Sequence, residues 1–135
     1  MKNKVVDDNH CFACGKDNPS GLKLSFEYMP STVTTHFTPQ RIHQGFKNIV
    51  HGGIISTLLD EVMAHLCLAE GFYGVTAKLE VRFKKPAYIN DELIITGELL
   101  EKKGRMLIAK AQAVNSKNEV VAFGNSTFVK VTEIL

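Results

Sequence analysis

The feature that most constrains the fold is one long apolar segment with two adjacent acids at its centre. It follows a pair of glycines and stops before Gly71, so it predicts a helix from Gly52 to Glu70. Apolar residues cover most of the helical circumference: Ile54, Ile55, Leu58, Leu59, Val62, Met63, Leu66 and Cys67. A helix that is apolar on nearly every side has to be enclosed by the rest of the protein. The segment is short for a membrane span and carries Asp60, Glu61 and His65, so we expect a buried helix.

Most of the remaining chain alternates between apolar and polar residues, which is typical of half-buried strands. The clearest strand follows the helix, where Ala77, Leu79, Val81 and Phe83 alternate with charged residues until Pro86 ends it. Five other strands are predicted, over residues 22–28, 32–37, 93–100, 106–114 and 120–131. Turns are predicted between them at residues 29–31, 103–104 and 116–118. One enclosed helix and about six mostly antiparallel strands predict an α+β fold, a curved sheet around a central helix, in one domain over residues 1–135.

Composition and charge exclude several other classes of protein. The formal net charge over 135 residues is +2, and Lys and Arg are spread along the chain, so we expect no nucleic-acid partner. The start, MKNKVVDDNH, lacks the apolar stretch of a signal peptide. Three cysteines cannot all pair, so a disulfide framework is not expected. We therefore expect a cytoplasmic protein that does not span a membrane.

The helix begins at His51-Gly52-Gly53, a sequence that can expose backbone donors. The first N–H groups of a helix have no partner within it, and paired glycines let a ligand approach the backbone. Such donors, aided by the helix dipole, suit a carbonyl oxygen that becomes negative during a reaction. The alternative is a turn in which glycine merely fits.

Asp60 and Glu61 lie in the middle of the apolar helix and need an explanation. Burying a carboxylate without a partner costs several kcal/mol or raises its pKa. Adjacent helical residues diverge by about 100°, so only one of the two is expected to face a given site. The alternative is that the acids face solvent or neighbours, which for Glu61 are Thr57 and His65. Because buried acids cluster at active sites, we expect at least one of the pair to be functional.

The spacing between Gly52 and Asp60 predicts that a second chain completes the site. Eight residues of helix separate the two by about 12 Å, too far for both to act on one carbonyl group. If two copies of the helix lie antiparallel across a twofold axis, Asp60 of one chain can approach Gly52 of the other. The strand over residues 76–84 is our candidate for pairing across that axis.

Several segments resemble one known family. The run HGGIISTLLDE (51–61), preceded by His43-Gln44-Gly45, resembles the motif of PaaI-like hotdog acyl-CoA thioesterases of the thioesterase superfamily. CFACGKDNPSGLKL (11–24) and TAKLEVRFKKPA (76–87) are similar to the opening and the post-helix strand of that group. The resemblance covers nearly the whole chain. It implies a hotdog fold and hydrolysis of an acyl-CoA by a homodimer or a dimer of dimers, without a metal or other cofactor.

The resemblance also implies roles for individual residues. Gly52 would donate its backbone N–H to the thioester carbonyl, and Asp60 would activate water or attack the carbonyl itself. Thr76 matches a position where a hydroxyl helps to hold the water or the acid; the alternative is an ordinary strand residue. Some relatives place Asn or Gln where this chain has Gly45, next to Gln44. His51 is expected to orient the turn, and the substrate is expected to contact His51, Gly53, Gln44 and Glu61. The phosphates of coenzyme A are expected to meet Arg82, Lys84 and Lys85. The alternative for these three cations is that they are solvated charges on the surface of a strand.

Cys11 and Cys14 form a CxxC pair after His10. A structural zinc site needs four ligands, and the third cysteine, Cys67, lies in the apolar helix, so no metal site is expected. Redox use of the pair lacks the usual strand–helix context. The segment is predicted to form a packed N-terminal loop.

Two other functions stay open on the sequence alone. The same pocket could bind acyl-CoA without hydrolysing it, as a sensor or carrier. The fold could also serve hydration or dehydration of an acyl thioester, but the His-containing motifs of those enzymes are absent, and Asp17-Asn18-Pro19 is only a partial match.

Overall fold

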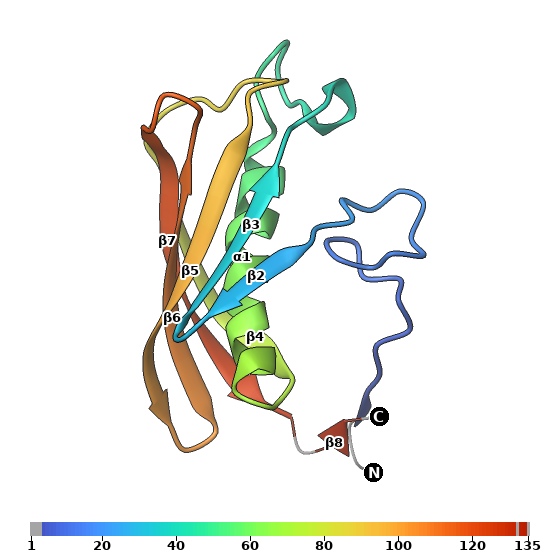
Figure 1. Ribbon diagram of the computed structural model, residues 1–135, viewed down its shortest axis with the longest axis vertical. Helices are drawn as coiled ribbons and strands as arrows, with labels where there is room; N and C mark the ends of the chain where they lie inside the picture. The colour runs from blue at the N-terminus through green and yellow to red at the C-terminus, as the bar shows by residue number, and fades with distance from the viewer. Residues whose placement is uncertain (1–3, 132, 135) are drawn as a thin grey trace.

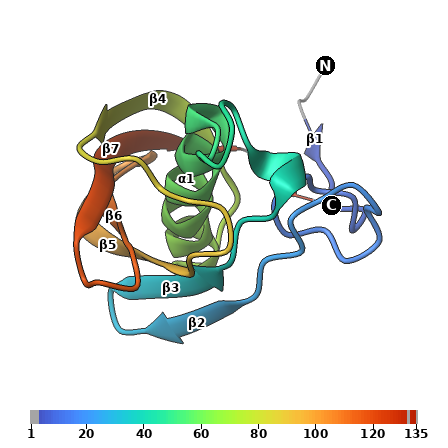
Figure 2. The ribbon, with the colours of Figure 1, turned by 90° about the horizontal axis from the view of Figure 1, so that it is seen from above.

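The computed structural model describes residues 4–131 and 133–134. Within them, one long helix, α1 (Gly52–Ala69), lies against a curved six-stranded sheet (Figures 1 and 2). The sheet has the order β2-β3-β5-β6-β7-β4, and every neighbouring pair is antiparallel. Its strands are β2 (Phe26–Met29), β3 (Thr32–Phe37), β4 (Gly74–Phe83), β5 (Leu93–Lys103), β6 (Met106–Val114) and β7 (Val120–Lys130). The predicted α+β arrangement, a sheet curved around a central helix, is therefore confirmed.

Two short elements complete the described chain. A 3-10 helix (Arg41–His43) precedes α1, and β1 (Lys4–Val5) pairs in parallel with β8 (Glu133–Ile134). Neither was predicted, because segments of two or three residues carry no periodicity.

Helix α1 has the predicted bounds to within one residue. His51 caps its start, and Glu70 and Gly71 end it, with a φ of 92° at Gly71 that favours glycine. By length and composition alone the helix could cross a membrane. Its apolar face packs instead on the sheet, through fully buried residues such as Leu58, Leu59, Val62 and Met63.

The enclosure of α1 is less complete than its sequence predicts. A stripe that includes Ile54, Asp60, Glu61 and Ala64 is only half-buried, and Leu68 is exposed. In Figure 2 the curved sheet surrounds one side of α1, and the N-terminal segment lies beyond the other.

The helix approaches the sheet closely at one point. A side chain added at Gly97 of β5 would place its Cβ 3.1 Å from the backbone carbonyl of Val62. Glycine at this position therefore allows the middle of α1, where Asp60 and Glu61 lie, to sit close against the sheet.

The strand predicted over residues 22–28 is too long at its start. Strand β2 begins only at Phe26, because residues 22–24 pair with the N-terminal loop: the N–H groups of Leu22 and Leu24 donate to the carbonyls of Phe12 and Ala13. Lys23, between them, has a φ of 53°, which interrupts the extended conformation. The alternating pattern is present, but its first residues form hydrogen bonds with the N-terminal loop instead of pairing within the sheet.

Candidate active site

Asp60 faces β4, where it meets Thr76. The Oγ1 of Thr76 donates a hydrogen bond of 2.9 Å to Oδ1 of Asp60. Burial raises the pKa of the Asp60 carboxyl, the hydrogen bond from Thr76 lowers it in part, and the charge of Glu61 raises it again. The net direction is upward. Of the two interpretations of Thr76, the structure supports a hydroxyl that holds the acid.

A β-bulge in β4 explains why Thr76 can reach the helix. Farther along β4, Leu79 and Val81 pack against the core, while Lys78 faces outward and pairs with Glu80 at 2.8 Å. Strict alternation would place Thr76 on the same outer side as Lys78. The pairing with β7 shifts register between Thr76 and Lys78, so Ala77 is the extra residue and Thr76 turns toward α1.

The start of α1 offers one backbone donor. His51 accepts the N–H of Gly53 on its Nδ1 at 2.8 Å, and its carbonyl accepts from Ile54 and Ile55. No hydrogen-bond acceptor for the Gly52 N–H occurs among the described residues. His51 thus caps the helix, and the Gly52 N–H is left without a partner among the described residues.

A cavity of about 330 Å³ opens beside this donor. It is lined by Gly52 and Ile55 of the helix, by Phe83 at the end of β4, and by Lys84 and Lys85. The Nζ of Lys85 is paired with the carboxylate of Glu119, and that of Lys84 lies 5.8 Å from the ring of Phe123. Both lysines line the cavity; among the described residues, Lys85 has an acidic partner and Lys84 has none.

Two predicted substrate contacts lie elsewhere in the structure. Arg82 is an exposed residue of β4, on the same outward side of the strand as Lys78, and does not line the cavity beside Gly52. The side-chain oxygen of Gln44 accepts the N–H of Asn48 at 3.2 Å, which braces the loop before α1.

Glu61 points to a different set of groups from Asp60. Its Oε2 lies 3.6 Å from the Sγ of Cys11 and 3.7 Å from the Nε2 of His65. Of the neighbours considered from the sequence, His65 is the one observed; Cys11, fifty residues away in the chain, could not be found from helical spacing. A substrate contact by Glu61 stays a prediction.

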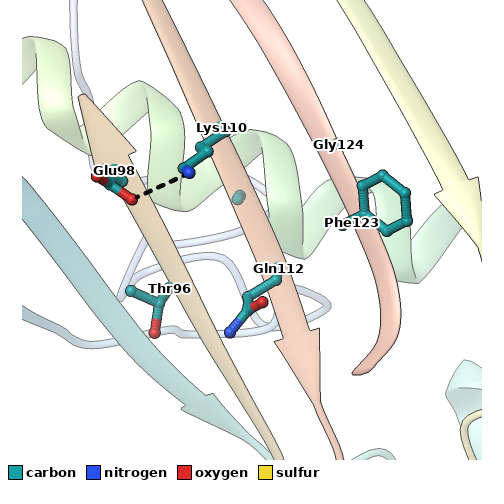
Figure 3. A pocket seen from close by; sticks show the side chains of 7 residues that line it. Thr96, Glu98, Lys110, Gln112, Phe123 and Gly124 are labelled. Carbon is teal, nitrogen blue, oxygen red and sulfur yellow. Dashed lines mark ion pairs between the residues drawn. The ribbon is translucent and has the colours of Figure 1, made fainter. Parts of the chain in front are cut away.

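A further hollow of about 330 Å³ lies on the outer face of the sheet (Figure 3). It is lined by polar side chains, among them Thr96, Gln112 and the ion pair between Glu98 and Lys110 at 3.6 Å. In Figure 3 these side chains and the helix lie on opposite sides of the strands. None of the predicted site residues lines this hollow.

Comparison with known proteins gives one consistent result. The family described as the thioesterase superfamily matches residues 47–122, more than half of the chain. The mouse (Mus musculus) acyl-coenzyme A thioesterase 13 is 26% identical over 101 residues, which cover 73% of this chain and 72% of that protein.

Solved structures give the same result for the fold. A thioesterase superfamily protein has a TM-score of 0.83 at 26% identity, covering 90% of this chain and 63% of that one. This chain thus spans less than two thirds of that protein. The E. coli PaaI protein from the phenylacetic acid degradation operon has a TM-score of 0.79 at 19% identity, covering 84% of each chain. At that level of identity the likeness concerns the fold alone.

Proposed function

From the premise that this chain belongs to the thioesterase superfamily and is a thioester hydrolase with the hotdog fold, we propose that its substrate is an acyl-CoA. We further propose that Asp60 of one subunit and the Gly52 N–H of another form each active site. The observation that carries the proposal is the half-buried Asp60 carboxylate, which accepts a hydrogen bond from Thr76 in the middle of an apolar helix.

Coenzyme A is supported as the carrier by relatives and by the chemistry of the cavity. Several curated relatives are named acyl-coenzyme A thioesterases. A hypothetical thioesterase of Streptococcus pneumoniae, with a TM-score of 0.76 at 20% identity, was solved with coenzyme A. In this chain Lys84, which lines the cavity beside Gly52 and forms no ion pair with a described acid, is suited to a phosphate group. We therefore assign the phosphate contact to Lys84. Lys85 is less suited because it is paired with Glu119, and Arg82 is less suited because it lies outside the cavity.

The proposed reaction uses two groups. The Gly52 N–H donates to the thioester oxygen as negative charge develops on it. Asp60 takes a proton from water as the water oxygen attacks the carbonyl carbon; the C–S bond then breaks, and the products are the free acid and coenzyme A as its thiol. Direct attack by Asp60 would form an anhydride that water hydrolyses to the same products. In both routes Thr76 positions the carboxylate and keeps it more readily ionised.

A homodimer, alone or as half of a dimer of dimers, is part of the proposal. Asp60 and Gly52 of one helix are separated by about 12 Å of rise. Strand β4 lies at the sheet edge, where it can pair with a second copy. Large apolar side chains are exposed on this strand, with 56% of Phe83 and 47% of Val75 accessible to solvent, and 81% of Phe46 is accessible in the loop before α1. Such residues, with the half-buried stripe of α1, suit a partner subunit. We propose that this dimer acts in the cytoplasm.

The substrate class is tested by thiol release from a series of acyl-CoAs with short, medium, long and aromatic acyl groups. We expect at least one to be hydrolysed with saturation kinetics, and the corresponding acyl-pantetheine, which lacks the nucleotide, to show a higher KM. Tight acyl-CoA binding without thiol release would identify a sensor or carrier instead. Conversion of an enoyl-CoA to a hydrated product would identify a hydratase.

Replacing Thr76 by valine should move the pH profile and lower the rate. Valine keeps the shape and suits a strand, but it removes the hydrogen bond that lowers the pKa of Asp60. That pKa then rises, so the acid limb of kcat/KM against pH moves to higher pH, and the plateau is expected to fall by about tenfold. Thr76→Ser, which keeps the hydroxyl, is the control. An acid limb that stays in place would show that Thr76 does not act through Asp60.

A further inference from the structure

The CxxC pair forms a compact turn beside α1. The Gly15 N–H donates to the carbonyl of Cys11 at 2.9 Å, which closes the turn directly after Cys14. A side chain at Gly15 would place its Cβ 2.4 Å from the backbone nitrogen of Cys11, so only glycine fits there. The pairing of residues 12 and 13 with residues 22 and 24 fixes this turn to the following segment. The two thiols are therefore held in place by the backbone.

Both thiols meet the carboxylate of Glu61. The Sγ atoms of Cys11 and Cys14 and a carboxylate oxygen of Glu61 all lie within 4.8 Å of one another. Glu61 comes from the centre of α1, so three potential ligand atoms converge from two segments fifty residues apart. Ligands at about 2.0 and 2.3 Å from a tetrahedral ion lie about 3.5 Å apart. The separation of 3.6 Å between Cys11 and Glu61 is close to this value.

His65 is oriented toward the same carboxylate. Its Nε2 lies 3.7 Å from the Oε2 of Glu61, the oxygen that faces Cys11. Its Nδ1 lies 2.6 Å from the hydroxyl of Tyr28, and its ring stacks on Phe26 with centroids 3.7 Å apart. A hydrogen bond at one ring nitrogen that fixes the other is the usual support of a metal-binding histidine.

A bound cation would offset the repulsion between ionised thiols and the Glu61 carboxylate. The two thiols and the Glu61 carboxylate lie within 4.8 Å of one another, so ionised thiols would place three negative charges together. A divalent ion would stabilise two thiolates and one carboxylate together.

We propose that Cys11, Cys14 and Glu61 bind one Zn²⁺ ion per chain. The Nε2 of His65, which lies beside Glu61 but outside that set of three, would move toward the ion as the fourth ligand. Two sulfurs, one nitrogen and one oxygen suit this borderline-soft ion, whereas Mg²⁺ and Ca²⁺ prefer oxygen ligands. A cavity of about 330 Å³, lined by these four residues and His10, gives the ion access from solvent. The site fastens the N-terminal loop to α1 one residue after Asp60 and serves a structural role, separate from the thioester chemistry.

The test is a titration of the metal-free, full-length protein with Co²⁺, which replaces Zn²⁺ and reports its ligands by absorption. We expect cobalt–thiolate charge-transfer bands that saturate at one ion per chain and disappear when Zn²⁺ is added. Cys14→Ser should weaken Co²⁺ binding by more than about a hundredfold, because losing a direct ligand exceeds the effect of losing an outer partner. Glu61→Gln should weaken it by at least about tenfold.

Two variants serve as controls. Cys67→Ala removes the cysteine that is buried in α1 outside the cluster and should titrate like wild type. Asp60→Asn should also titrate like wild type, which separates this site from the proposed active site. Absence of charge-transfer bands in the folded wild-type protein, or bands that are unchanged in a folded Cys14→Ser variant, would overturn the proposal. The wild-type titration decides the matter even where a variant fails to fold.

Discussion

Replacement of Asp60 by asparagine is expected to lower kcat for thioester hydrolysis by about 10²–10⁴-fold, the range that a positioned general base contributes. Asparagine keeps the size of the side chain and can still accept the hydrogen bond from Thr76, but it cannot take a proton from water. The matched control is Asp17→Asn, which makes the same change at an exposed loop position. Steady-state kinetics on both variants measure the effect. Undiminished turnover by Asp60→Asn would remove Asp60 from the mechanism.

The same variant should be more stable than the wild type at neutral pH. Burial raises the pKa of Asp60 in the folded protein above its value in the unfolded chain. The ionised carboxylate therefore destabilises the fold once the pH exceeds the unfolded value, and asparagine removes that cost. A melting temperature a few degrees higher, with a difference that shrinks as the pH falls toward the ordinary range of an Asp, is the expected result. Thermal unfolding across that pH range checks the sign.

Replacement of Gly52 by proline should lower kcat by about 10²–10³-fold, the effect of losing one oxyanion donor. Gly52 is the first residue of α1, where proline is well tolerated, and His51 before it is already extended, with φ −60° and ψ 133°. Proline removes the N–H and leaves the helix intact. Gly52→Ala is the control because it keeps the N–H, and its added Cβ would meet only the ring of Phe83 at 3.5 Å. Equal losses in the two variants would indicate a steric effect instead of a lost donor.

Mixing the two inactive variants tests whether the site is shared between subunits. In a dimer of one Asp60→Asn chain and one Gly52→Pro chain, one site carries both defects and the other carries neither. Random reassociation makes about half of the dimers mixed, each with one intact site, so about a quarter of the wild-type activity should return. If Asp60 and Gly52 acted within the same chain, mixing would restore nothing.

The sequence predicted the helix and most strands because those elements depend on local patterns. Gly52 to Glu70 was bounded by glycines, and the observed helix ends within one residue of the prediction. The run from Met106 to Val114 was found with its exact bounds. The strand before Met29 was overextended, because alternation does not distinguish pairing with a sheet from pairing with a loop.

Some properties of the site residues likewise follow from local sequence patterns, whereas others depend on tertiary packing. The sequence placed Asp60 in the middle of a buried helix and Gly52 at its start, since both positions follow from helical periodicity and length. It could not show that Lys85 is paired with Glu119 or that Gln44 braces its own loop. Those contacts depend on where separate segments pack.

The amino-acid sequence by itself thus determined which residues are helical, which alternate in strands, and that two adjacent acids lie in the middle of the apolar helix, because each depends on neighbours a few positions away. Only the tertiary structure decided that Thr76 faces Asp60, since a bulge at Ala77 reverses the alternation that would have turned it outward. It also decided that Glu61 meets Cys11 and Cys14, because that contact joins a loop and a helix whose relative position is set by the packing of the whole chain.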